Sequence, residues 1–293
     1  MEKKEALYDK SVRELLTVHG LKASKSMGQN FLIDANIPEK IVKLSGIDKS
    51  CGILEVGPGL GALTQVLCKA AGFVTAVELD KSLVPILESL FAEQPNVRIV
   101  QGDILKIDIG KLTHETMRGL DHHVCANLPY NITTPAITAF IESNTFISIT
   151  VMVQREVALR ICAKPGSPEY GAFTVYANYH TIPEILFDVS PGSFTPRPKV
   201  LSSVVRMTRR AERLLDEQDE KLFFRVVRAA FGQRRKTLVN ALYSVFEKTL
   251  SKEVISEIVS GCGYDVRIRG EVLGVDDYIK LSSFIKKQNC NYL

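Results

Sequence analysis

Two short motifs contain the residue types best suited to chemistry. One is the glycine turn at residues 55–61, EVGPGLG, and the other is Asn127-Leu128-Pro129-Tyr130. In the second motif, Asn127 offers a side-chain carbonyl, Leu128 a main-chain carbonyl and Tyr130 a stacking face. An amine conjugated to a ring needs acceptors for its N–H groups and a surface that holds the ring flat. The second motif therefore predicts methyl transfer to a planar amine.

The glycine turn follows an apolar run and precedes a helical pattern. Gly57, Gly59 and Gly61 lack a Cβ, so the chain can turn sharply there and a ligand can approach the backbone closely. The spacing G-x-G-x-G differs from the dinucleotide fingerprint G-x-G-x-x-G, and no Lys-Ser/Thr pair follows for a nucleotide-triphosphate loop. Alone, the turn is also compatible with a purely structural role.

Acidic residues follow the next two predicted strands. Glu78 can accept hydrogen bonds from both ribose hydroxyls of an adenosine cofactor, and Asp103 can accept from the adenine amino group. S-adenosylmethionine is favoured over a nicotinamide because a sulfonium cofactor has a cation and an amino acid end to hold. Asn30, the backbone at Leu32 and the ring of Phe31 or Tyr130 can provide those contacts. The predicted cofactor-binding residues are Gln29, Asn30, Leu32, Gly57, Gly59, Gly61, Glu78, Leu79, Asp103, Ile104 and Asn127.

The pattern around these motifs predicts an α/β sheet with helices on both faces. Seven strands are predicted, at 53–56, 74–78, 97–101, 124–127, 148–153, 185–189 and 203–207. Helical spacing occurs between them at 63–71, 83–92, 134–142 and 156–163. Before the sheet, residues 11–44 read as two helical pieces separated by a polar turn at 22–28.

The character of the chain changes after Thr208. Residues 209–220 form a charged connector, and helices are predicted at 222–231, 236–247, 252–259 and 275–286. We therefore expect a catalytic domain at 1–208, including the N-terminal helical extension, and a separate helical domain at 209–293.

Composition narrows the class of protein. The 293 residues are 45% hydrophobic and 24% charged, which suits a globular protein of about two domains. The charged first ten residues do not read as a secretory signal, and no segment is long and apolar enough to span a membrane. The six cysteines include no Cys-x-x-Cys pair, so we expect reduced thiols, a cytoplasmic location and no metal site.

The formal charge of +4 is unevenly distributed. From Arg206 onward there are 17 Lys+Arg and 12 Asp+Glu, a net of +5, which leaves −1 for residues 1–205. This excess indicates either a polyanionic partner or an ordinary solvated helical surface.

At the level of whole motifs, the chain resembles the ribosomal RNA adenine dimethyltransferase family, specifically its KsgA (RsmA) branch. The matching segments are QNFL at 29–32, ILEVGPGLG at 53–61, ELD at 78–80, NLPYNI at 127–132, VQRE at 153–156, FTPRPKV at 194–200 and FGQRRKTL at 231–238. They extend over most of the chain. The resemblance implies a class I methyltransferase fold with a seven-stranded, mostly parallel Rossmann-like sheet, and a smaller helical, RNA-binding domain at 209–293.

The resemblance also implies a reaction and a site. The enzyme would use S-adenosylmethionine to dimethylate N6 of two adjacent adenosines in the 3′-terminal hairpin of small-subunit (16S) ribosomal RNA, with a role in small-subunit biogenesis. The catalytic residues it implies are Asn127, Leu128, Pro129, Tyr130 and, as a second stacking face, Phe194. One departure is Leu201, where the family more often has Asp, which puts a polar role of that position in doubt.

A base inside an RNA helix cannot reach such a pocket, so the target adenosine must be everted. Phosphate contacts are then expected from a basic group and two weaker candidates: Arg225, Arg228, Arg234, Arg235, Lys236, Arg155 and Lys199. The expected partner is small-subunit RNA within a pre-30S particle, bound by a monomer.

Three other functions remain open. The large-subunit (23S) RNA adenine methylases of the macrolide-resistance type share the cofactor turn, although segment 234–238 favours the KsgA branch. DNA-adenine and protein-glutamine methylases usually read Asn/Asp-Pro-Pro-Tyr, and here Leu128 replaces the first proline. A mainly non-catalytic ribosome assembly factor is the third.

Overall fold

The structure of the chain is a computed structural model that describes residues 29–290. The predicted helical piece that starts at residue 11 and the polar turn at 22–28 lie outside the described residues. The second predicted piece corresponds to α2 (Asn36–Ser45), which is followed by Gly46 in the left-handed region, with φ of 70°.

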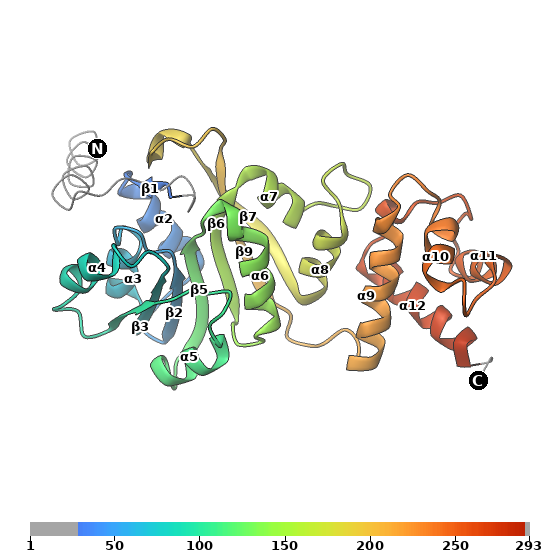
Figure 1. Ribbon diagram of the computed structural model, residues 1–293, viewed down its shortest axis with the longest axis horizontal. Helices are drawn as coiled ribbons and strands as arrows, with labels where there is room; N and C mark the ends of the chain where they lie inside the picture. Colours follow the sequence, from blue (N-terminus) through green and yellow to red (C-terminus); the bar gives the residue numbers. More distant parts are fainter. Residues whose placement is uncertain (1–28, 291–293) are drawn as a thin grey trace. The chain divides into compact units, whose positions relative to one another are not determined.

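A seven-stranded sheet dominates the first part of the chain (Figure 1), in the order β4-β3-β2-β5-β6-β9-β7. Its strands are β2 (Cys51–Val56), β3 (Phe73–Glu78), β4 (Val97–Gln101), β5 (Asp121–Asn127), β6 (Ser148–Gln154), β7 (Thr181–Val189) and β9 (Ser202–Arg209). Strands β2 to β6 pair in parallel, while β9 runs antiparallel to β6. This mixed, mostly parallel sheet confirms the predicted fold class. A second sheet pairs β1 (Phe31–Leu32) with β8 (Phe194–Thr195).

Helices cover the sheet between its strands. They are α3 (Thr64–Ala70), α4 (Val84–Leu90), α5 (Ile109–Thr116), α6 (Thr133–Glu142) and α7 (Arg155–Ile161), with the 3-10 turns η1 (Tyr130–Ile132) and η2 (Pro191–Ser193). Parallel crossovers are right-handed, and the strand order reverses direction after β4. Therefore α3 and α4 lie on one face of the sheet, and α5 and α6 lie on the other. The reversal point falls between β2 and β5, where the carboxyl ends of two adjacent strands diverge into separate loops.

The middle of the sheet is buried on both faces. Every residue of β2 is buried, and β6 is buried from Ser148 to Val153. Such strands appear in a sequence as near-continuous apolar runs, which explains why they are predicted within two residues of their observed bounds. A rigid, buried sheet fixes the loops that leave its carboxyl edge.

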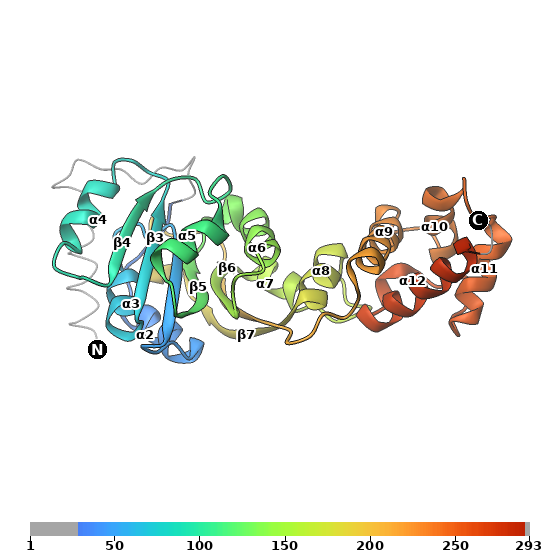
Figure 2. The ribbon, with the colours of Figure 1, turned by 90° about the horizontal axis from the view of Figure 1, so that it is seen from below.

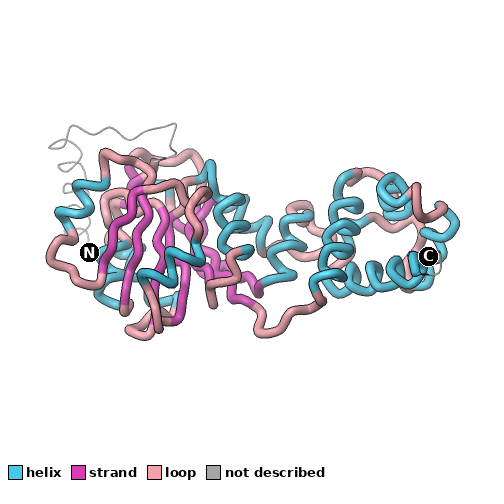
Figure 3. The backbone as a smooth tube through the Cα atoms, turned by 60° about the horizontal axis from the view of Figure 1, so that its bottom comes forward, coloured by secondary structure: helices cyan, strands magenta, loops and turns pink. Residues whose placement is uncertain are grey.

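The last part of the chain is helical, with α9 (Glu217–Gly232), α10 (Leu238–Phe246), α11 (Lys252–Gly261), the turn η3 (Gly270–Val272) and α12 (Val275–Cys290). Figure 3 shows helices and loops there without strands, and Figure 2 shows α9 to α12 grouped together. α9 packs against α10 and α12 around a buried core that includes Phe223, Leu242 and Tyr278.

The chain divides into two compact units, 1–158 with 184–209 and 159–183 with 210–293. The chain passes between these units after residues 158, 183 and 209, and the predicted boundary after Thr208 lies one residue from the last of these points. The segment 159–183, which contains α8 (Ala172–His180), groups with the C-terminal helices, a feature that the sequence pattern does not indicate. The catalytic and RNA-binding roles assigned to two domains remain predictions.

The charged connector is shorter than predicted. α9 begins at Glu217, because Asp216 caps it by accepting from the Asp219 N–H and acidic residues fill its first turn. The helices α5 and α8 and the two-stranded β1–β8 sheet were not predicted. Among residues 29–290, no helix has the length and apolar character needed to cross a membrane.

Candidate active site

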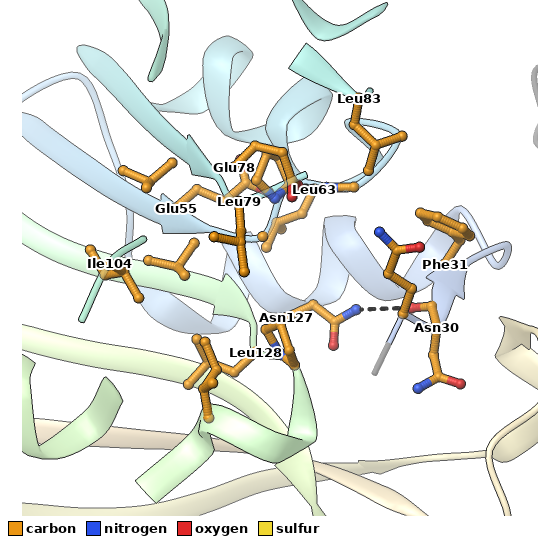
Figure 4. Close-up of a pocket in the computed structure, with 18 of the residues that line it drawn as sticks. Asn30, Phe31, Glu55, Leu63, Glu78, Leu79, Leu83, Ile104, Asn127 and Leu128 are labelled. Atoms are coloured by element: carbon orange, nitrogen blue, oxygen red, sulfur yellow. Dashed lines mark hydrogen bonds between the residues drawn. The ribbon is translucent and has the colours of Figure 1, made fainter. Parts of the chain in front are cut away.

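A cavity of about 190 Å³ opens at the carboxyl edge of the sheet, at the point where the strand order reverses. Its lining residues, many of which are drawn in Figure 4, come from the segments 29–32, 55–63, 77–79, 102–104 and 127–132, together with Leu83. These segments contain the carboxyl ends of β2, β3 and β5 and residues of the loops that follow β2, β3, β4 and β5. The first segment, 29–32, contains β1. The structure thus brings together residues that are about 100 positions apart in sequence.

The glycine turn forms one wall of the cavity. Gly57 and Gly59 adopt left-handed conformations, with φ of 69° and 60°. A Cβ on Gly59 would lie 3.1 Å from the Phe31 ring, and one on Gly57 would lie 3.3 Å from Pro129. Both glycines are therefore needed for conformation and for the close approach of neighbouring segments.

Gly61 differs from the other two glycines, because it does not line the cavity. Its φ is 79°, and an added Cβ would lie 2.8 Å from the Phe91 ring. The structure therefore gives Gly61 a packing function beneath the turn. Its predicted contact with the cofactor has no counterpart in the cavity wall.

Glu78 anchors the turn to the end of β3. Its buried carboxylate accepts from the Gly59 N–H at 3.2 Å and from the Asp80 N–H at 2.8 Å. Burial raises the pKa of Glu78, and these two hydrogen bonds partly oppose the shift. Asp80 in turn accepts from the Gln29 side-chain amide at 2.9 Å, a link that the sequence interpretation missed.

The residues after β3 and β4 add two apolar side chains, Leu79 and Ile104, and one acidic residue, Asp103, to the cavity wall. Leu79 lines the cavity and is 50% exposed, whereas Ile104 lines it and is buried. Asp103 accepts from the Leu105 N–H and lies 3.5 Å from the Lys106 amine. Its carboxylate is partly exposed and stabilises its own turn, and the residue lines the cavity.

The loop after β5 forms the opposite wall. The Asn127 amide nitrogen donates to the Asn30 main-chain carbonyl at 3.5 Å (Figure 4). Because the amide oxygen points away from that contact, it is left to accept from a ligand. The Pro129 carbonyl already accepts from the Ile132 N–H and the Thr133 hydroxyl. Tyr130 lines the cavity beside them.

Phe194 lies away from this wall. Phe194 belongs to β8 and is only 3% exposed. It is part of the same hydrophobic core as Leu32 and Met152. It does not line the cavity. In this conformation the structure does not bring Phe194 to Tyr130 as a second stacking face, because pairing of β8 with β1 holds its ring inside.

The predicted RNA-binding residues fall into two groups. Arg234 donates to Glu271 and to the carbonyls of Pro168 and Tyr170, and Arg225 lies over the Phe246 ring and donates to the Val245 carbonyl. Arg155 is paired with Asp188. By contrast, within the described part of the chain no hydrogen bond or ion pair engages the exposed side chains of Arg228, Arg235, Lys236 and Lys199.

Glu55 is a buried acid at the base of the cavity. It is 1% exposed and accepts from the Thr64 hydroxyl at 2.6 Å. Burial raises the pKa of Glu55 to about 8, and the nearby Glu78 adds to the shift. In the sequence, the only sign of a buried acid is that Glu55 stands inside the apolar run Ile53-Leu54-Glu55-Val56, and the sequence alone does not predict a role for it.

Replacing Glu55 with glutamine is expected to flatten the dependence of stability on pH. The folded protein keeps a proton that an unfolded chain releases above a pKa of 4.5, so the free energy of unfolding falls as pH rises towards about 8. Glutamine imitates the neutral acid at every pH. The Tm advantage of Glu55→Gln over wild type should therefore grow between about pH 6 and pH 8.

Thermal denaturation across this pH range measures the effect. Glu88→Gln, at an exposed position of α4, is the control and should follow the wild-type profile. Parallel profiles for Glu55→Gln and wild type would show that Glu55 is ionised in the folded protein.

The described residues, 29–290, contain no candidate metal site, because no three His, Cys, Asp or Glu side chains among them are placed to hold an ion together. The cavity wall is instead carboxylates, amides and apolar side chains.

Comparison with known proteins gives consistent matches. The family described as "Ribosomal RNA adenine dimethylase" matches residues 20–265. A "Ribosomal RNA small subunit methyltransferase A" of Shouchella clausii is 45% identical over 270 residues, 92% of this chain and 91% of the relative. One of the same name from Alkaliphilus oremlandii is 42% identical over 280 residues, 95% and 97% of the two chains.

Solved structures share the fold. A dimethyladenosine transferase from Plasmodium falciparum superposes with a TM-score of 0.76 at 24% identity, covering 88% of this chain and 98% of that one. The 23S rRNA methyltransferase ErmE superposes with a TM-score of 0.69 at 23% identity, covering 88% and 100%.

Proposed function

The chain belongs to the ribosomal RNA adenine dimethylase family, and from this premise we propose that it transfers methyl groups from S-adenosylmethionine to N6 of two adjacent adenosines in the 3′-terminal hairpin of small-subunit ribosomal RNA. Family membership makes it an rRNA adenine dimethyltransferase. The small subunit as the source of the RNA is supported by the names of the relatives, which are at least 40% identical to this chain.

The observation that carries the proposal is the convergence of Glu78, Asp103 and Asn127 on one cavity beside the glycine turn. The Glu78 carboxylate suits the two ribose hydroxyls, and Leu79 and Ile104 provide apolar surfaces for a flat adenine. The acidic wall favours a ligand that carries positive charge. When bound, S-adenosylmethionine would supply a methyl group attached to a sulfonium. The sulfur leaves as a neutral thioether, so the leaving group needs no activation by the protein.

The chain's own residues then act mainly by positioning the amine. The Asn127 amide oxygen and the Leu128 carbonyl accept the N6 hydrogens, while Tyr130 stacks on the ring. These acceptors orient the nitrogen lone pair towards the methyl carbon. Transfer gives a positively charged, methylated nitrogen, which is acidic and releases its proton to water to leave the neutral methylated amine, so no general base is required.

The two groups of basic residues predict different effects on RNA binding. Arg235 and Lys236 are exposed without ion pairs inside the described chain, so each is expected to contact phosphate. Replacing either with alanine should lower the slope of log affinity against log salt by roughly 0.7–0.9. Arg234→Ala is the matched control: it should leave the slope unchanged and lower Tm, because Arg234 holds Glu271 and two carbonyls.

Titrations of the full-length variants with small-subunit RNA at several salt concentrations measure these slopes. Unchanged slopes in both Arg235→Ala and Lys236→Ala would remove this segment from the RNA interface.

Label transfer from S-adenosylmethionine tests the function directly. Purified protein should label small-subunit particles and leave large-subunit RNA unlabelled. Label in large-subunit RNA alone would favour the 23S alternative. A protein that binds small-subunit particles without labelling them would favour a non-catalytic assembly factor.

A further inference from the structure

The far end of the Tyr130 side chain is held by a second element of the fold. The Tyr130 hydroxyl lies 2.7 Å from the Ser202 hydroxyl, although the two residues are 72 positions apart. Tyr130 opens the turn η1 and lines the cavity, whereas Ser202 opens β9 and is fully buried. The hydrogen bond therefore joins the loop after β5 to the sheet.

The sheet fixes the position of Ser202. Ser202 pairs with Gln154 where β9 meets β6, and the next N–H along, that of Arg155, donates to the Leu201 carbonyl at 2.9 Å. A tyrosine side chain rotates about its Cα–Cβ and Cβ–Cγ bonds, so its backbone position alone does not determine where its ring lies. The phenolic oxygen lies on the axis of the second rotation, so a hydrogen bond to it holds the direction in which the ring extends from the backbone, which the first rotation sets.

We infer that Ser202 is a positioning residue for methyl transfer: its hydroxyl holds the Tyr130 ring at the place in the cavity wall where the target adenine stacks. The inference rests on the proposed function of the cavity. Of the residues that line the cavity, Phe31 and Tyr130 are the aromatic ones, and Phe194 is buried elsewhere. Tyr130 lies in the loop that follows Asn127, so the place of its ring sets where a stacked adenine presents N6 to the methyl donor.

Loss of the hydrogen bond between Tyr130 and Ser202 has a specific kinetic consequence. The Tyr130 ring would still be present and could still contact a base, so binding of RNA would change little. The fraction of bound adenines in a reactive orientation would fall, and small misplacements of reacting groups reduce rates strongly. The effect should therefore appear in kcat and leave KM and cofactor affinity largely intact.

Ser203 provides a matched control. It is the next residue, is equally buried, and its side chain points to the other face of the strand. Its hydroxyl donates to the Asp188 carboxylate at 2.6 Å. Ser203→Ala and Ser202→Ala each remove one buried hydroxyl hydrogen bond from the same strand, and both should lower Tm. Only the Ser202 change releases Tyr130.

The experiment compares Ser202→Ala, Ser203→Ala, Tyr130→Phe and the Ser202→Ala/Tyr130→Phe double variant on small-subunit particles. We expect Ser202→Ala and Tyr130→Phe each to lower kcat by about 10-fold, with KM for RNA within about 3-fold of wild type. Ser203→Ala should stay within about 2-fold in kcat. The double variant should lose no more than either single variant, because both break the same hydrogen bond.

Equal kcat in Ser202→Ala and Ser203→Ala, or additive losses in the double variant, would overturn the positioning role. Should Ser202→Ala fail to fold, Tyr130→Phe breaks the same hydrogen bond from the partly exposed side, and an unchanged kcat there would overturn it equally. Failure of wild type to label small-subunit particles would instead count against the proposed function.

Discussion

Replacing Asn127 with alanine is expected to lower the rate of methyl transfer by at least about 100-fold, the range seen when a preorganised polar contact to a reacting group is removed. The amide oxygen of Asn127 is the acceptor that orients the N6 lone pair, and alanine leaves no atom in its place. The Asn127 nitrogen also donates to the Asn30 carbonyl, so part of the cavity wall loosens as well.

Single-turnover label transfer at saturating RNA measures this loss. Asn127→Asp is the informative comparison, because it keeps an acceptor oxygen and loses the donor to Asn30. The expected order of rates is wild type, then Asn127→Asp, then Asn127→Ala. Thermal denaturation should show all three folded, because Asn127 is only partly buried. A rate for Asn127→Ala within about 10-fold of wild type would remove this residue from the reaction.

Replacing Glu78 with alanine is expected to weaken cofactor binding by about 100-fold, because hydrogen bonds to a charged acceptor are among the strongest in proteins. The carboxylate is proposed to hold two ribose hydroxyls, and it also fixes the Gly59 N–H and the Asp80 N–H. Alanine removes all of these contacts. Glu78→Gln retains one acceptor oxygen and should lie between wild type and Glu78→Ala.

Calorimetric titration with S-adenosylhomocysteine, the demethylated product, measures the change in Kd. The same ligand should raise the Tm of wild type and leave that of Glu78→Ala nearly unchanged, because only binding to the folded state stabilises it. Equal Kd values for the two proteins would place the ribose elsewhere in the cavity.

Much of the site was predictable because the carboxyl ends of parallel strands meet at one edge of a sheet. Once the strands were recognised from their apolar residues, Glu78, Asp103 and Asn127 were expected near the glycine turn. Their exact hydrogen bonds were not predictable. The link from Gln29 to Asp80 depends on how segment 29–32 crosses the turn, and nothing local in the sequence encodes that path.

Some roles predicted for single residues stay predictions, and some features of the fold were not predicted, for physical reasons. Phe194 belongs to a two-residue strand, too short for any periodicity, and its pairing with β1 turns the ring into the core. Arg234 and Arg235 are identical in sequence terms, and only tertiary contacts distinguish an arginine that holds Glu271 from one that faces solvent. The start of α9 was readable, because Asp216 followed by Glu217, Asp219 and Glu220 is a typical helix N-terminus.

Mass spectrometry of small-subunit ribosomal RNA from cells with and without this protein tests the central claim most directly. The account predicts two adjacent N6,N6-dimethyladenosines in the 3′-terminal hairpin of the RNA from cells that have the protein. Both should be absent without it and return when the wild-type gene is restored. Dimethyladenosines that persist in the small-subunit RNA without the protein, or a loss of methylation confined to large-subunit RNA, would contradict the account.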